Sequence, residues 1–202
     1  MKSEKILEML SENKIEELKQ LLREEISLNG SSNKDITKAI IKLSKQAEKD
    51  QKQRGGHYIR PVLAGAYILN GKQCICNGCW GVMYDNITTG TTNVPNDLEN
   101  YFDITKVIPS FDNREWFDID ITELANKVKI FKAEHKDIEP SIKAKEFYYV
   151  AKNVCLLADT FENVKFSITD NGMMLLKGNN GKGIFLQLRI VGNAETHCVM
   201  EV

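Results

Sequence analysis

Asn-Gly dipeptides divide two stretches of this chain into short apolar segments, and this punctuation constrains the fold more than any other feature. Asn-Gly is typical of tight hairpin turns, so each stretch is expected to form an antiparallel meander of three strands. A helical pattern precedes each stretch, and the order helix, strand, strand, strand recurs at 34–84 and 144–190. Two such units, each burying a sheet face under a helix, predict a duplicated α+β fold. The expected strands and their dividing dipeptides are 61–69, Asn70-Gly71, 72–76, Asn77-Gly78 and 80–84, then 163–169, Asn171-Gly172, 173–177, Asn180-Gly181 and 183–190.

Residues 1–54 have helical periodicity. Asn13 followed by Glu16 has the form of an N-terminal cap, and Asn29-Gly30 is a typical helix end. Ser31-Ser32-Asn33 supplies the next cap, and a second helix is expected from 34 to about 52. We therefore predict a helical extension at 1–30 in front of a single domain at 31–192. The apolar positions of the first helix are Ile15, Leu18, Leu21, Leu22 and Ile26.

The predicted domain has two halves, 31–84 and 120–192, joined by a polar connection at 85–119 that is rich in Thr, Asn and Asp. The connection holds one strand-like segment at 102–108, closed by Pro109. Asp120 with Glu123 is expected to begin a helix that runs to about residue 132. An extended segment at 138–142 and a helix at 144–159 follow, before the strands of the second meander.

Composition excludes several classes of protein. The chain has 27 basic and 28 acidic side chains, and a net charge of −1 excludes a uniformly basic nucleic-acid binder while permitting a local basic face. No apolar run approaches the roughly 20 residues of a membrane span, and the N-terminus lacks the apolar core of a secretion signal. Five cysteines do not form a disulfide framework. We therefore expect a reducing, cytoplasmic setting and no contact with a membrane.

Cys74, Cys76 and Cys79 form a C-x-C-x-x-C pattern that invites a zinc interpretation. Zinc needs a fourth ligand, and His57 or Cys198 could complete the set only by a coincidence of folding. The alternative is that these small side chains fill a sheet core, and strand alternation places the first two on one face. We adopt this alternative and expect no bound metal.

No catalytic motif is apparent. The three histidines, His57, His135 and His197, lie in expected loops or tails without a nucleophile or carboxylate at a catalytic spacing. The glycine-rich segment 178–183 joins two strands, whereas a phosphate cradle of this kind opens a helix. The sequence therefore predicts a protein that is not an enzyme and needs no cofactor.

The helix expected at 34–54 carries a lysine stripe, defined as Lys38, Lys42, Lys45, Lys49 and Lys52. Their spacings of four and three residues place the five side chains within about 40° of one line along the helix. Apolar residues, including Ile40 and Leu43, fall on the opposite side. A row of like charges weakens an isolated helix slightly, and a sequence selected only for solubility would interleave Glu. The first interpretation of such a row is a solvated face, and the second is a face that meets phosphate.

The second helix, expected at 144–159, has a core face and an opposite face that is less basic. Lys145 and Lys152 share that opposite face with Tyr149 and Leu156, and these two suggest packing against another element. The core face consists of Phe147, Val150, Val154, Leu157 and Ala158.

Several segments, taken in order, resemble the bacterial DNA sliding clamp, the processivity factor of the replicative polymerase. Residues 161–170 (FENVKFSITD), after the helix, are similar to the E-N-V-x-hydrophobic-T-D strand of a clamp. Residues 60–65 (RPVLAG) resemble the P-I-L-S/A-G strand, and 102–109 (FDITKVIP) resemble the F-P-D-Y-x-x-V-I-P segment between clamp domains. The likeness covers about 34–190, but a full clamp subunit has several such domains.

The resemblance implies a DNA-clamp-like fold in which helices face the DNA backbone. On this basis the expected contacts to double-stranded DNA, independent of sequence, are made by the lysine stripe together with Lys145 and Lys152. The end of the last strand corresponds to a clamp's P-M-R-L-like tail, so Leu188, Arg189 and Ile190 are the expected partner-binding residues. The resemblance further implies a homo-oligomer, replication proteins as partners, and a shortened clamp of phage or mobile-element type.

The sequence thus favours a non-catalytic, sliding-clamp-like protein that contacts duplex DNA. The alternative is a protein-interaction module on the same fold, without DNA binding, in which residues 1–30 bind a partner. An enzyme or zinc protein built on the cysteines comes third. The first two differ in whether the N-terminal helices cover the lysine stripe.

Overall fold

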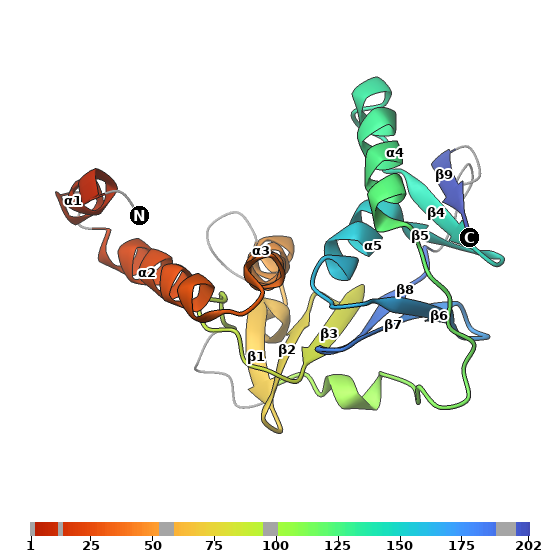
Figure 1. The fold of residues 1–202 in the computed structure, drawn as a ribbon, viewed down its shortest axis with the longest axis horizontal. Helices are drawn as coiled ribbons and strands as arrows, with labels where there is room; N and C mark the ends of the chain where they lie inside the picture. Colours follow the sequence, from red (N-terminus) through yellow and green to blue (C-terminus); the bar gives the residue numbers. More distant parts are fainter. Residues whose placement is uncertain (1–2, 12–13, 53–58, 95–100, 189–196) are drawn as a thin grey trace.

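The computed structural model describes residues 3–11, 14–52, 59–94, 101–188 and 197–202. The chain is an α+β protein with N-terminal helices, a six-stranded antiparallel sheet and a three-stranded mixed sheet (Figure 1). The helical elements are α1 (Ser3–Ser11), α2 (Ile15–Gly30), α3 (Lys34–Gln51), η1 (Pro61–Leu63), η2 (Ile104–Lys106), α4 (Ile121–Glu134) and α5 (Ala151–Ala158). The strands are β1 (Gly65–Leu69), β2 (Lys72–Cys76), β3 (Trp80–Tyr84), β4 (Ser141–Ala144), β5 (Phe147–Val150), β6 (Lys165–Ile168), β7 (Met173–Gly178), β8 (Gly181–Leu186) and β9 (Cys198–Glu201).

The large sheet consists of the two predicted meanders, joined edge to edge. Its strand order is β1-β2-β3-β8-β7-β6, and every neighbouring pair is antiparallel. Turn chemistry explains the first hairpin, since Asn70 and Gly71 have φ angles of 51° and 76°, as a two-residue Asn-Gly turn requires. The prediction of two antiparallel meanders is confirmed.

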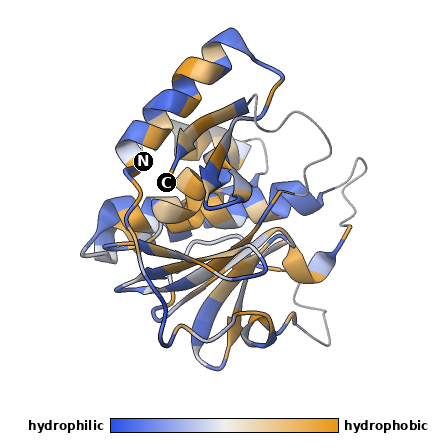
Figure 2. Cartoon of the chain, turned by 90° about the vertical axis from the view of Figure 1, so that its right-hand side faces the viewer, coloured by the Kyte–Doolittle hydropathy of each residue, from blue (hydrophilic) through white to orange (hydrophobic). Residues whose placement is uncertain are grey.

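The helices α3 and α5 lie on the same side of the large sheet, as predicted (Figure 1). Asn33 caps α3 by accepting a hydrogen bond from the backbone N–H of Ile36 at 3.2 Å. The main core lies between these helices and the sheet. Figure 2 shows the corresponding apolar stretches along the strands and on the helices above them. From the helices the core includes Ile40, Leu43, Ala47, Val154 and Leu157, and from the sheet Ile75, Val82, Phe166, Leu176 and Phe185.

The opposite face of the large sheet has a smaller apolar cluster of its own. Tyr67, Cys74 and Met83 are cross-strand neighbours on β1, β2 and β3, and Ile104 of the connecting segment covers them. Burial of both faces explains why β3 (WGVMY) is an apolar run without polar alternation.

The prediction of a helix at 144–159 is partly wrong. Its first half is strand β5, which pairs with β4, and only α5 (Ala151–Ala158) is helical. Lys145 has a φ of 55° in the tight turn between β4 and β5, a backbone conformation that a helix does not contain. The run Phe147–Val150 is aromatic and β-branched, so it suits a strand once β4 is available as a partner.

Three smaller predictions need correction. The strand expected at 61–69 begins only at Gly65, since Pro61 opens a 3-10 turn that ends at Leu63. The strand-like segment 102–108 contains the 3-10 turn Ile104–Lys106 instead. The last strand runs from Gly181 to Leu186, so the turn before it is Asn179-Asn180.

The three-stranded sheet was not predicted. Its order is β5-β4-β9, with β9 parallel to β4, and α4 packs against α5 and β9. Asp120 caps α4, as predicted, by accepting from the backbone N–H of Glu123 at 2.8 Å. Asn13 lies outside the described residues, so the cap proposed there is not described.

Candidate nucleic-acid interface

The lysine stripe lies along the exposed side of α3. Leu43 and Ala47 are fully buried on the opposite side of this helix, which fixes its orientation on the sheet. All five lysines of the stripe are exposed, as the helical spacing predicts. In Figure 1, α2 lies on one side of α3 and α5 on the other, and α3 packs against both.

Three lysines of the stripe are engaged by carboxylates. Lys38 pairs with Asp35 at 3.2 Å and Lys52 with Glu48 at 3.8 Å, both within or directly after α3. Lys45 pairs with Glu24 of α2 at 2.7 Å. Exposed pairs of this kind contribute about 0–1 kcal/mol, so phosphate could compete for the two intrahelical lysines at little cost. The Glu24 carboxylate is mostly buried, with 15% of its side chain exposed, and holds Lys45 more firmly.

Lys42 and Lys49 form no ion pair with the residues that the structure describes. Lys42 lies on the α5 side of the stripe, where it lines a small cavity of about 190 Å³ together with Lys152 and Asp159. Burial raises the pKa of the Asp159 carboxyl, and the Lys42 ammonium acts in the opposite direction. Lys42, Lys49 and Lys152 therefore form a group of exposed cations on α3 and α5, which we call the helix-layer lysines.

Lys145 does not belong to this group. It lies in the turn between β4 and β5, where its backbone N–H donates to the carbonyl of Val202 at 3.4 Å. The expectation that Lys145 and Lys152 share a helix face is wrong, because the helix begins only at Ala151.

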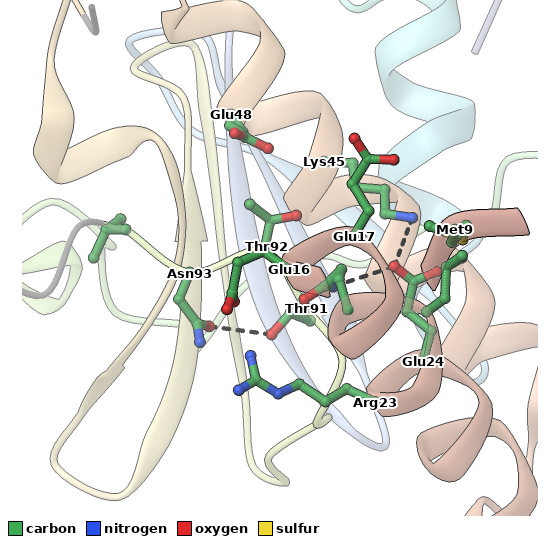
Figure 3. Close-up of a pocket in the computed structure, with 13 residues that line it drawn as sticks. Met9, Glu16, Glu17, Arg23, Glu24, Lys45, Glu48, Thr91, Thr92 and Asn93 are labelled. Carbon is green, nitrogen blue, oxygen red and sulfur yellow. Dashed lines mark hydrogen bonds and ion pairs between the residues drawn. The ribbon is translucent and has the colours of Figure 1, made fainter. Parts of the chain in front are cut away.

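A groove of about 720 Å³ lies between α2, α3 and the segment after β3. Figure 3 shows its lining, with Glu16, Glu17, Arg23 and Glu24 of α2 on one side. Lys45 and Glu48 of α3 and Thr91, Thr92 and Asn93 complete it. Four carboxylates face two basic groups here, so this groove disfavours a polyanion.

The acidic groove was not predicted from the sequence. The signal that could have indicated it is the cluster of Glu residues on one side of α2, but only the tertiary packing of α2 on α3 brings Glu24 to Lys45. The N-terminal helices thus cover one edge of the lysine stripe and leave Lys42 and Lys49 exposed.

The N-terminal helices also present apolar side chains to solvent. Ile15, Leu22 and Ile26 lie along one line of α2 and are 46%, 40% and 68% exposed. On α1, Leu7 and Leu10 are exposed as well. Within the described part of the chain, each of these five residues is at least 40% exposed.

The expected partner-binding tail is only partly described. Leu188 is half-buried, and its backbone N–H donates to the carbonyl of Tyr148 at 2.7 Å. Arg189 and Ile190 lie outside the described residues. The role of this tail stays a prediction.

Cys74 and Cys76 lie on the same face of β2, as strand alternation predicts, and both are buried beside Ile104. Burial raises the pKa of the Cys74 thiol to about 12 and also raises that of Cys76. Cys79 is exposed, directly before β3. Within the described ranges no group of three or more His, Cys, Asp or Glu side chains could hold a metal ion. His57 lies outside those ranges, while the rings of His135 and His197 lie near that of Phe131.

We expect Cys79 to react far faster than Cys74 and Cys76 with a thiol-specific reagent in the native protein at pH 8. The reagent attacks the thiolate, which burial disfavours at the two core positions. Mass spectrometry of partly modified protein should locate the first label of this cluster on Cys79, and Cys79→Ser should remove it. Labelling of Cys74 at a comparable rate without unfolding would contradict the buried placement.

No protein-family model, curated protein or solved structure matches this chain. No helix in the described part of the chain is both long and apolar enough to cross a membrane.

Proposed function

We propose that this chain is a non-catalytic, sliding-clamp-like protein that contacts the backbone of duplex DNA through its helix layer. The proposal rests on the helix-layer lysines, Lys42, Lys49 and Lys152, which are exposed on two helices that share one side of the sheet. None of the three forms an ion pair with a described carboxylate. The arrangement of α3 and α5 over two meanders also fits the resemblance to clamps. Phosphate contacts of this kind position a protein on DNA without reading its sequence.

The proposal includes a homo-oligomer. Three lysines supply only a small positive charge for binding a polyanion, so a single chain should bind duplex DNA weakly. Several copies around one duplex would add their contacts. Replication proteins would then be the partners of the assembled form. The net charge of −1 is compatible with this arrangement because only one face needs to be basic.

We expect duplex DNA to bind weakly, without sequence preference, and with a steep dependence on salt. Each neutralised phosphate contributes about −0.9 to the slope of log K against log salt, so three to five lysines give about −3 to −4.5 per chain. Fluorescence anisotropy of a labelled duplex at several salt concentrations measures this slope. The titration should extend to protein concentrations at which sedimentation shows oligomers.

The variant Lys42→Glu/Lys49→Glu should lower the affinity for duplex DNA at least tenfold at low salt. A matched control is Lys19→Glu/Lys136→Glu, which makes the same charge change at exposed lysines outside the helix-layer lysines. Circular dichroism should show both variants folded, because all four side chains are exposed. Equal loss in both variants would mean that only net charge matters, and no loss in either would remove the helix layer from the proposal.

The second candidate function is a protein-interaction module without DNA binding. The exposed apolar side chains of α1 and α2 favour it, together with the engagement of Lys45 by Glu24. It predicts that no oligomer of the chain binds duplex DNA at low salt, and that Ile15→Asp/Leu22→Asp abolishes self-association or partner capture while leaving the fold unchanged.

A further inference from the structure

Three lysines lie side by side on the face of the large sheet that is turned away from α3 and α5. Lys165 of β6 is directly opposite Lys177 of β7, and Lys177 is directly opposite Lys182 of β8. The same row continues with Met83 of β3, then Cys74 of β2 and Tyr67 of β1. These three residues belong to the apolar cluster of that face. Neighbouring strands are about 4.8 Å apart, and like charges directly opposite one another destabilise a sheet.

Two of these lysines have aromatic rings as their neighbours instead of carboxylates. The ammonium of Lys177 lies 5.8 Å from the centre of the Trp116 ring, and that of Lys182 lies 5.4 Å from the centre of the Phe111 ring. Neither lysine forms an ion pair with a residue of the described ranges. Lys165, at the edge, pairs with the exposed Asp118 at 2.6 Å.

The two rings belong to the connecting segment and are held beside the sheet. Phe111 and Trp116 contact each other, with ring centres 5.4 Å apart. Directly after them, Phe117 exchanges two backbone hydrogen bonds with Phe166 of β6, at 2.8 and 2.9 Å, which ties the segment to the edge of the sheet. Both rings are half-buried, so each keeps part of its surface accessible.

Two clefts adjoin this row and meet at Lys177 and Gly178. The larger, about 370 Å³, is lined by Trp116, Asn163, Lys165 and Asn179 in addition to the two shared residues. The smaller, about 210 Å³, is lined by Lys72, Asp85, Phe111, Gly181 and Lys182 in addition to the same two. Among the described residues that line these clefts, Asp85 is the only carboxylate, and Lys72 neutralises it at 2.7 Å.

The turn between the two clefts is firmly anchored. The side chain of Asn180 donates to the carbonyl of Thr160 at 2.9 Å and accepts from the backbone N–H of Glu162 at 3.0 Å. The backbone carbonyl of Asn180 accepts a hydrogen bond from the backbone N–H of Asp85 at 3.1 Å. The backbone of this turn is therefore held in place beside the two clefts.

We propose that this face binds single-stranded nucleic acid, with bases stacking on Trp116 and Phe111 and phosphates meeting Lys165, Lys177 and Lys182. Single-strand sites combine a basic surface with exposed aromatic rings, because every unpaired base offers a face for stacking. Duplex DNA keeps its bases stacked inside, so it offers no base face to the two rings. The site is independent of the helix-layer lysines, which lie on the other side of the sheet.

Intrinsic fluorescence gives a direct readout, because the chain has two tryptophans and Trp80 is only 2% exposed. Titration with an oligothymidylate of about 12 nucleotides at low salt should quench the emission of Trp116. Anisotropy of the same oligonucleotide, labelled, then measures affinity in the variants. Lys177→Glu/Lys182→Glu should lower it at least tenfold, and Trp116→Leu at least fivefold, while Trp116→Phe should retain most of it.

Two controls separate binding at this site from binding by the helix layer and from attraction by charge alone. The variant Lys42→Glu/Lys49→Glu should bind the oligonucleotide as tightly as the unchanged protein, whatever happens to its binding of duplex DNA. Inorganic polyphosphate, which has charge but no bases, should bind more weakly than the oligonucleotide and respond little to Trp116→Leu. The proposal is overturned if the oligonucleotide does not bind at low salt, if polyphosphate binds equally well, or if the Lys177/Lys182 variant binds normally.

Discussion

Phe166→Ala is expected to lower the free energy of unfolding by about 3–5 kcal/mol, the largest effect of a single change that we predict. Phe166 is fully buried in β6 and packs within the main core beneath the helices. Its ring lies 6.3 Å from that of Phe117, which anchors the connecting segment to the sheet. Truncation would leave a cavity and loosen that anchor. Urea denaturation followed by circular dichroism measures the difference.

The matched control for this change is Lys165→Ala, one position earlier on the same strand. Lys165 is exposed, and its surface ion pair with Asp118 is worth about 0–1 kcal/mol, so the loss should stay below about 1 kcal/mol. Similar decreases in the free energy of unfolding for the two variants would mean that the Phe166 side chain of β6 is not in the core.

Leu43→Ala should cost about 2–5 kcal/mol, because Leu43 is fully buried on the packed side of α3. Lys42→Ala, at the adjacent position on the exposed side, should change the free energy of unfolding by no more than about 0.5 kcal/mol. The same urea titration applied to both variants tests the orientation of α3. If Lys42→Ala lowered the free energy of unfolding strongly and Leu43→Ala did not, the assignment of the two faces would be reversed. The basis of the proposed DNA contact would then be removed.

Features with local causes could be predicted from the sequence. The Asn70-Gly71 hairpin, the Asn33 cap and the two faces of α3 depend on turn chemistry and on a single periodicity, so the residues themselves specify them. The run Phe147–Val150 is different, since it fits a helix or a strand. Pairing with β4, which is a tertiary contact, decides in favour of the strand.

Features that depend on long-range pairing could not be predicted. Strand β9 joins the small sheet by parallel pairing with β4, far away in the chain. The row of Lys165, Lys177 and Lys182 exists only because of the registers of β6, β7 and β8. The engagement of Lys45 by Glu24 likewise follows from the packing of α2 on α3. No pattern within the sequence specifies which of these distant segments pair with one another.

Lysine acetylation with and without bound duplex DNA tests the proposed function most directly. Bound DNA should protect Lys42, Lys49 and Lys152 from an amine-reactive acetylating reagent, as measured by mass spectrometry of peptides. Exposed lysines that are not among the helix-layer lysines, such as Lys19 and Lys136, should react equally in both samples. Protection that is absent from α3 and α5, or that falls on α1 and α2 instead, would contradict a DNA-facing helix layer.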